Sequence, residues 1–349
     1  MPTLVLGGSG YVAGELLRLI AVHPRLELVA AVSDSKPGER LAAAFPHLAS
    51  AYPETAFVSI DAALRLVTTL PRTAILAAAP HGVSAALIDR LLTAAAAAGT
   101  APRVVDISAD YRFRDADAYA AVYRHPHGAP GRLGDFTCAL PEQLATLATT
   151  HVAHPGCFAT AMLLAIVPLL QFGIVEPTFY VSGVTGSTGS GRTPTDSTHH
   201  PRRHGDLYAY GALAHRHAPE VIAIAASLTG RTAELNFVPH SGPFARGIHA
   251  TTQARLARPM SAAEVREALA EYYAGQPFVR ILADAPRLKD VVTSNYAHLS
   301  ATTSGNTLAV MSVVDNLAKG AAGGAVQWLN RMYGWDQTTG LAAPAPGWT

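Results

Sequence analysis

The sequence predicts an α/β protein in which a doubly wound parallel sheet is followed by an α+β domain. Two local observations carry this prediction. The first hundred residues alternate short apolar runs with helical patterns, and a glycine-rich turn follows the first of these runs. The length agrees, because 349 residues are enough for two domains of ordinary size.

Composition narrows the classes of function. Lys plus Arg number 26 and Asp plus Glu number 25, so the net charge is +1. A protein with this charge does not have the strong positive electrostatic field that is typical of proteins that bind nucleic acids or membrane surfaces. Hydrophobic residues make up 49%, which allows a large core. No apolar run reaches the ~20 residues of a membrane span, and two cysteines, Cys138 and Cys157, are too few for a disulfide framework. We expect a cytoplasmic protein that binds neither nucleic acid nor membrane.

The expected elements follow from apolar periodicity and turn residues. In the first half we expect strands at 3–6, 26–32, 74–79 and 103–107, and helices at 15–21 and 83–98. Proline and glycine cluster at 126–134, which places a boundary near 150 and gives domains 1–152 and 153–314. After the boundary we expect a long functional loop at 186–210 and strands at 234–238 and 248–256. A helix should follow at 261–274, opened by a Ser261–Glu264 capping box. We then expect a hairpin around 304–306 and a last helix near 317–332.

The glycine-rich turn at 7–14 joins the first strand to the first helix. Gly8, Gly10 and Ala13 fit G-x-G-x-x-G/A, in which small residues let the main chain approach a pyrophosphate at a helix N-terminus. A merely tight turn is the alternative, but the position directly after an apolar strand favours a Rossmann-type dinucleotide site. Its predicted contacts are Gly7, Ser9, Gly10, Tyr11 and Val12.

The end of the second expected strand should distinguish NAD from NADP. Asp34 can accept hydrogen bonds from a ribose 2′-hydroxyl, which favours NAD. Ser33, Ser35 and Lys36 can instead hold a 2′-phosphate, which favours NADP. The residues themselves leave this choice open.

Cys157 is the candidate nucleophile. Pro155-Gly156 forces a turn directly before it and an apolar helix follows, so the thiol should lie at the first residues of that helix. Helix N-termini favour the thiolate and lower the pKa of a cysteine there, and a thiolate attacks acyl carbon. The alternative, a buried structural cysteine, is the reading we give to Cys138.

Several histidines are candidates for the proton acceptor that a cysteine nucleophile needs. They are His199, His200, His204, His215 and His217. A metal site is the rival interpretation, but none of them has H-E-x-x-H or paired C-x-x-C spacing, so we predict no metal. A cysteine beside a dinucleotide site suggests attack on an activated acyl group, followed by hydride reduction of the thioester.

Ordered motifs along nearly the whole chain resemble the N-acetyl-gamma-glutamyl-phosphate reductase family, relatives of aspartate-semialdehyde dehydrogenase. These are residues 7–18, 80–84, 106–112, 140–142, 152–168, 215–220, 246–248 and 315–321. The resemblance implies a cytoplasmic NADPH-dependent reductase of a small acyl phosphate in arginine biosynthesis, a homodimer or homotetramer. It also implies that 315–349 pack back on the cofactor domain.

Residue roles follow from the same resemblance. It implies Cys157 as nucleophile and His215 or His217 as acid–base residue, with His217 favoured. Further cofactor contacts fall on Pro80, Gly82 and Asn316, and substrate contacts on Ser108, Arg112 and Arg192.

Two alternatives stay open. The loop at 197–203 is similar to that of a sister reductase of lysine biosynthesis, whose aminoadipate phosphate is attached to an acidic carrier protein. Arg202, Arg203 and His204 would face that carrier, or belong to an ordinary solvated loop. A non-catalytic nucleotide sensor that kept the fold is the other rival, since a fold does not fix a function.

Overall fold

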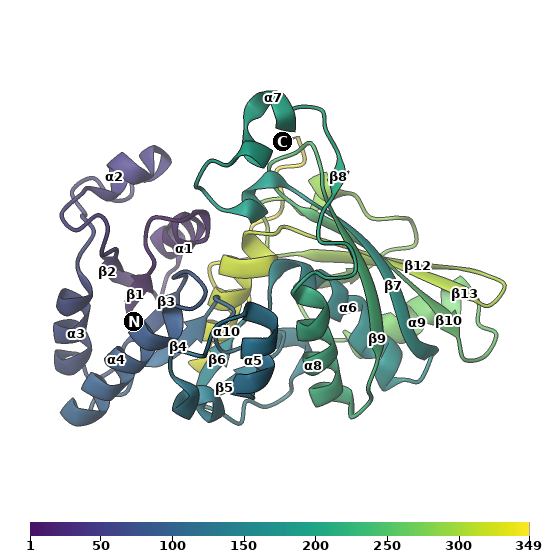
Figure 1. The fold of residues 1–349 in the computed structure, drawn as a ribbon, viewed down its shortest axis with the longest axis horizontal. Helices are drawn as coiled ribbons and strands as arrows, with labels where there is room; N and C mark the ends of the chain where they lie inside the picture. The colour runs from purple at the N-terminus through teal and green to yellow at the C-terminus, as the bar shows by residue number, and fades with distance from the viewer. Residues whose placement is uncertain (349) are drawn as a thin grey trace. The chain divides into compact units, whose positions relative to one another are not determined.

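The computed structural model describes residues 1–348, and in that range the strands form two sheets, one of six strands and one of seven (Figure 1). The chain divides into two compact units. Unit 1 contains residues 1–139, 146–154 and 322–341, and unit 2 contains 140–145, 155–321 and 342–348. The prediction drew the borders at 152 and 314, whereas here residues 315–321 belong to unit 2.

Unit 1 is a parallel sheet with helices on both faces. Its strands lie in the order β2-β1-β3-β4-β6-β5, and each neighbouring pair is parallel. The elements are β1 (Pro2–Leu6), α1 (Tyr11–Val22), β2 (Glu27–Val32), α2 (Leu41–Ala44), α3 (Ile60–Thr69), β3 (Ala74–Ala77), α4 (Ser84–Ala98), β4 (Arg103–Asp106), α5 (Ala116–Tyr123), β5 (Phe136–Cys138), β6 (His151–Ala153) and α10 (Gly323–Met332).

Successive side chains of the buried strands point to opposite faces of the sheet, so a core forms on each face. Leu4 and Leu6 of β1 pack in one cluster with apolar residues of α3 and α4. On the other face, α1 contacts β1 and β2, and α10 contacts β4 and α1. Because β1 is followed by β2 on one side and β3 lies on the other, the strand order reverses at β1, and ligands of such sheets bind at the carboxyl ends of the strands there.

Unit 2 is a mixed sheet in the order β11-β12-β13-β10-β7-β9-β8, with α6, α8 and α9 packed against it (Figure 1). Its helices are α6 (Cys157–Gln171), α7 (His200–Arg203), α8 (His217–Thr229) and α9 (Ala262–Tyr272), and a π-helical turn covers Ala318–Ala322. Its strands are β7 (Val175–Thr185), β8 (Tyr208–Ala209), β9 (Glu234–Ser241), β10 (Ile248–Leu256), β11 (Val279–Ile281), β12 (Ala297–Ser304) and β13 (Thr307–Val314).

Helix α6 is almost wholly buried although it contains Pro168. Proline has no N–H, so the carbonyl of Leu164, four residues earlier, loses its helical donor. The buried hydroxyl of Tyr273 donates to this carbonyl at 2.7 Å. A hydrogen bond from the end of α9 therefore replaces the missing helical hydrogen bond and joins α6 to α9.

Most predicted elements lie within two residues of their observed bounds. The Ser261–Glu264 capping box is confirmed, and strand β10 has the predicted limits. Four expectations were incomplete. The helix predicted at 15–21 begins at Tyr11, and the strand predicted at 234–238 continues to Ser241. The predicted last helix begins as a π-helical turn, because the Gly320 N–H donates to the carbonyl of Asp315, five residues earlier, at 2.9 Å. The loop at 186–210 contains short helical turns and β8.

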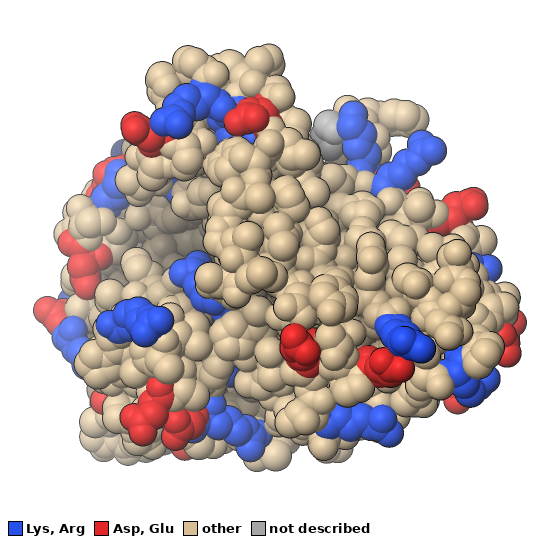
Figure 2. Space-filling view, turned by 45° about the vertical axis from the view of Figure 1, so that its right-hand side comes forward, with Lys and Arg blue, Asp and Glu red and all other residues tan. Residues whose placement is uncertain are grey.

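On the face that Figure 2 shows, the charged side chains are mixed in sign. Figure 2 shows Lys, Arg, Asp and Glu scattered over the visible face without a continuous patch of one sign. Within residues 1–348, no helix is both long enough and apolar enough to cross a membrane.

Candidate active site

The turn after β1 makes room for a ligand at one glycine. Gly7 has φ +75°, and a Cβ there would lie 2.5 Å from the Ala78 carbonyl oxygen, so main-chain packing requires glycine. Gly10 caps α1 with φ −83°, which any residue adopts, and an added Cβ would meet nothing within 4 Å. The space in front of α1 is therefore open at a helix start that has no side-chain cap. This arrangement fits a dinucleotide pyrophosphate.

A second loop lies at the same end of the sheet, after β3. Asp110 holds it by accepting from the N–H groups of Gly82 at 2.8 Å and Ala85 at 2.9 Å. His81 accepts from the Ala109 N–H at 2.9 Å. The predicted cofactor residues Pro80 and Gly82 thus belong to a loop that buried polar contacts with the β4 loop keep in place.

The residues after β2 are engaged with one another. Asp34 accepts from the N–H of Ile60 at 3.0 Å, at the start of α3. Lys36 pairs with Glu39 at 2.8 Å, and the hydroxyls of Ser33 and Ser35 lie 3.3 Å apart. Asp34 and Lys36 thus both already hold structural contacts, so these contacts favour neither the ribose nor the 2′-phosphate assignment.

Two predicted substrate residues are buried in unit 1. Ser108 donates to Asp106 at 2.7 Å, and burial raises the pKa of Asp106 to about 6 although Ser108 and Ser84 hydrogen-bond to it. Arg112 donates to the carbonyls of His154 at 3.1 Å and Ile107 at 2.8 Å. The structure gives both side chains a part in holding the loop at the end of β4.

Cys157 is the first residue of α6, as predicted, and its side chain is partly exposed. Gly156 caps the helix, and its N–H donates to the buried carboxylate of Glu220 at 2.7 Å. Glu220 comes from the first turn of α8. A residue 64 positions away in the sequence therefore positions the turn that presents the thiol.

Two histidines stand beside this turn. His217 is buried and begins α8, and its N–H donates to Nδ1 of His215 at 3.3 Å, with the ring centroids 4.8 Å apart. Burial, together with Arg216, lowers the pKa of His215 to about 4, so His215 is neutral near pH 7. The aromatic ring of Phe158 contacts both imidazoles edge-on.

Cys157, His215 and His217 line one cavity of about 430 Å³. The other lining residues are Phe158, Thr185, Gly189, Ser190, Tyr210, Gly211, Ala214 and Arg216. Burial raises the pKa of Tyr210, and the neighbouring Cys157 adds to the shift. Tyr210, Arg216 and Glu220 were not among the site residues predicted from the sequence. The signal for Arg216 was present, since it stands between the two histidines.

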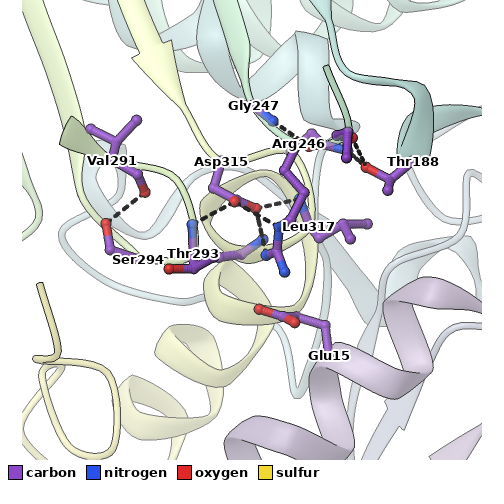
Figure 3. Close-up of polar contacts among 12 residues, drawn as sticks. Glu15, Thr188, Arg246, Gly247, Val291, Thr293, Ser294, Asp315 and Leu317 are labelled. Atoms are coloured by element: carbon purple, nitrogen blue, oxygen red, sulfur yellow. Dashed lines mark hydrogen bonds and ion pairs between the residues drawn. The ribbon is translucent and has the colours of Figure 1, made fainter. Parts of the chain in front are cut away.

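Asp315 holds the π-helical turn that lies against Cys157, and Figure 3 shows the polar contacts of Asp315. The buried Asp315 carboxylate pairs with Arg246 through two contacts of 2.9 Å and accepts from the N–H of Thr293 at 2.7 Å. It also accepts from Leu317 and Ala318, which closes the π-helical turn. In that turn a Cβ on Gly320 would lie 2.8 Å from Cβ of Cys157, so only glycine fits behind the thiol.

Two further predicted residues lie in unit 2. Asn316 accepts from the Gly247 N–H at 2.7 Å and donates to the Thr188 hydroxyl at 3.0 Å, so its amide joins two loops. Arg192 is exposed just beyond Ser190 and does not line the cavity. Among residues 1–348 no cluster of three His, Cys, Asp or Glu side chains could hold a metal ion.

Two family models together match most of the chain. The model described as "Semialdehyde dehydrogenase, NAD binding domain" matches residues 3–148, and the model for the "Semialdehyde dehydrogenase, dimerisation domain" matches residues 157–316. The chain is also similar to solved structures that show the same fold. Aspartate semialdehyde dehydrogenase II from Vibrio cholerae has a TM-score of 0.68 at 15% identity, covering 95% of this chain and 98% of that one. The enzyme from Candida albicans, solved with NADP, has a TM-score of 0.63 at 16% identity, covering 93% and 96%.

Curated relatives are closer in sequence. The N-acetyl-gamma-glutamyl-phosphate reductase of Acidithiobacillus ferrooxidans is 37% identical over 343 residues, 97% of this chain and 96% of the relative. The reductase of the same name from Methanopyrus kandleri is 36% identical over 351 residues, 97% of each. The predicted resemblance and fold class are confirmed. The chain belongs to the semialdehyde dehydrogenase family, within its group of N-acetyl-gamma-glutamyl-phosphate reductases.

Proposed function

We propose that this protein reduces N-acetyl-gamma-glutamyl phosphate to the semialdehyde and phosphate with NADPH, as a step of arginine biosynthesis. The observation that carries the proposal is the cavity in which Cys157, at the start of α6, meets His217, at the start of α8. The names of the relatives supply the substrate.

The first chemical step falls to the thiol. The start of α6 stabilises the thiolate of Cys157, because unpaired main-chain N–H groups and the helix dipole favour a negative charge there. His217 takes the thiol proton, Sγ attacks the acyl carbon, and the bond from that carbon to the phosphate oxygen breaks. The proton goes to the departing phosphate, and the acyl group stays on Cys157 as a thioester.

The turn between β1 and α1 would hold the cofactor. Gly7 to Val12 would hold the pyrophosphate, and Ser33, Ser35 and Lys36 the 2′-phosphate. When bound, NADPH supplies the hydride that reduces the thioester carbon. The C–Sγ bond then breaks, the aldehyde leaves, and Cys157 returns as a thiolate that regains its proton through His217.

Arg216 is our candidate for the anionic groups of the substrate. It lines the cavity with Cys157 and carries a fork of donors that suits carboxylate or phosphate oxygens. Arg192, Ser108 and Arg112 stay predictions from the resemblance. Ser108 and Arg112 would act through the loop that they hold.

We also propose that the protein is a cytoplasmic homodimer. The face of the unit 2 sheet opposite its helices exposes Tyr180 and Ser182 of β7, and beside them lie Gln253 and Thr251 of β10. The match to a dimerisation domain supports a second copy as the partner of this face.

Light scattering should give a mass of two chains, and Tyr180→Asp should give monomers. A tetramer that persists in Tyr180→Asp would place the main interface elsewhere.

The substrate is tested in the reverse reaction, the oxidation of the semialdehyde, because its reagents are stable. We expect NADP reduction with N-acetylglutamate semialdehyde that depends on added phosphate, and a much lower rate with the aminoadipate analogue, with or without an acidic carrier protein. A higher rate with the carrier-linked analogue would select the lysine-pathway alternative. Reduction of NADP without phosphate would contradict acyl-phosphate chemistry.

A further inference from the structure

Unit 2 contains a second polar cavity, of about 310 Å³, that the proposed reaction does not use. Its lining residues are Ser187, Thr198, His200, Arg203, His204, Pro243, Phe244 and Ala245. None of these residues lines the cavity of Cys157. The second cavity is therefore a separate candidate site.

Arg203 is the unusual member of this lining. It is 8% exposed, and Nη1 donates to the carbonyl of Asp206 at 3.1 Å, whereas Nε and Nη2 are buried without a hydrogen-bond partner. The neighbouring Arg202 has a side chain that is 70% exposed. Burying a guanidinium without acceptors is costly, so two N–H directions of Arg203 require oxygens that the protein does not supply.

The surroundings of Arg203 point to a negatively charged ligand. No Asp or Glu lines the cavity in the described part of the chain. Asp206 contributes only its main-chain carbonyl, and the carboxylate of Asp196 is fully exposed and 3.9 Å from Arg202. His200 and His204, with ring centroids 5.1 Å apart, add further potential donors.

We propose that this cavity binds a compact oxyanion, the carboxylate or phosphate group of a small molecule. Turned toward the cavity that its side chain lines, Arg203 would present Nε and Nη2 as one edge of the guanidinium fork, and two oxygens of a carboxylate or phosphate match that edge. Pro243 and Phe244 give the cavity an apolar wall beside the charge, which suits a short carbon chain attached to the anion.

An occupied cavity would steady one wall of the catalytic cavity. Ser187 lines the anion cavity and opens the short turn Ser187–Ser190, whose last residues line the cavity of Cys157. The same turn is tied to the apolar wall, because the Ser187 N–H donates to the Phe244 carbonyl at 2.9 Å. The inference does not depend on the identity of the reductase substrate.

The test is calorimetric titration of the full chain with inorganic phosphate and, separately, with glutarate, at constant ionic strength. We expect the wild type to bind at least one of them, and the stronger of the two identifies the anion class. Arg203→Gln should weaken that binding at least about tenfold, since hydrogen bonds to a charged group are lost. Arg202→Gln, the exposed neighbour, should change it less than about twofold.

A second comparison separates this cavity from the catalytic one. Arg216→Gln removes only the proposed anion contact of the catalytic cavity, so the binding that depends on Arg203 should persist in this variant. Loss of binding in Arg216→Gln with retention in Arg203→Gln would overturn the proposal, and so would absence of binding in the wild type. If Arg203→Gln does not fold, Arg203→Lys decides the question, because it keeps the charge but not the fork and should still weaken binding. Reductase activity, measured in parallel, reports separately on the proposed function.

Discussion

The two units present their functional groups in different ways. In unit 1 the candidate cofactor site is mainly a main-chain surface, formed where the short turn 7–10 joins β1 to α1. In unit 2 the candidate catalytic site consists of side chains from segments 157–158, 185–190 and 210–217, which are distant in sequence. A site made of main chain depends on which residues are small, whereas a site made of side chains depends on long-range packing.

The largest effect is expected from removing the thiol. Cys157→Ser should lower kcat on the order of 10⁴-fold or more, because loss of a nucleophile removes the covalent route. Binding of NADPH, measured by fluorescence titration, should not change, since the cofactor site lies in unit 1. Full turnover by Cys157→Ser would support a non-covalent mechanism, and an inactive wild type that binds NADPH would support the nucleotide-sensor alternative.

The next effect distinguishes the two histidines. His217→Gln should lower kcat/KM by about 10²- to 10⁴-fold, the usual contribution of general acid–base catalysis. His215→Asn should cost less, because an amide oxygen can still accept from the N–H of residue 217, and because the low pKa of His215, about 4, makes it a poor base. A larger loss in His215→Asn would reverse the assignment.

Two glycines test whether unit 1 uses its main chain as described. Gly10→Ala should raise the Kd for NADPH, with about tenfold corresponding to 1.4 kcal/mol, and should leave the melting temperature unchanged because its Cβ meets only open space. Gly7→Ala should instead destabilise the fold by at least about 1–2 kcal/mol, the cost of a left-handed residue. Unchanged NADPH affinity in Gly10→Ala would mean that the cofactor does not approach this turn.

The smallest effect compares one buried histidine in each unit. Burial lowers the pKa of His151 in unit 1 to about 4, and the pKa of His215 in unit 2 to a similar value. The unfolded chain binds protons near pH 6.5, so stability from these groups is present above that pH and is lost as the pH falls toward 4, by at most ~1.4 kcal/mol per pH unit for each.

Denaturant unfolding measured between pH 7 and pH 4.5 checks this expectation. His151→Gln should reduce the slope of the unfolding free energy against pH by the contribution of one bound proton. His215→Asn should reduce it by the same amount. If the units unfold in separate transitions, each substitution should act on one transition only. A pH dependence as steep in both variants as in the wild type would contradict the assigned shifts.

The same contrast explains how much the sequence could predict. The G-x-G-x-x-A turn, the Ser261–Glu264 capping box and the place of Cys157 at a helix start are local patterns, and the structure has all three. The family, on which the predicted enzyme class and cofactor rested, is confirmed by the relatives and by both family models. The individual catalytic roles stay predictions.

What the sequence could not predict depends on distant contacts. Glu220 has no motif of its own that links it to Gly156, and Gly320 becomes necessary only because the Cα and Cβ of Cys157 lie against it. Arg202 and Arg203 look alike in the sequence, and only their burial separates a solvated cation from a buried one. These differences arise from tertiary packing, for which neighbouring residues give no signal.

The hydrogen bond from Gly156 to Glu220 has a consequence for how this protein can evolve. It fastens the start of α6 to the first turn of α8 across 64 positions of sequence, and the mainly exposed loop 191–207 lies between these two points in the sequence. Insertions or deletions in that loop need not disturb the distance between Sγ of Cys157 and the imidazole of His217. Substrate preference can therefore change during evolution while Cys157 and His217 keep their positions relative to each other.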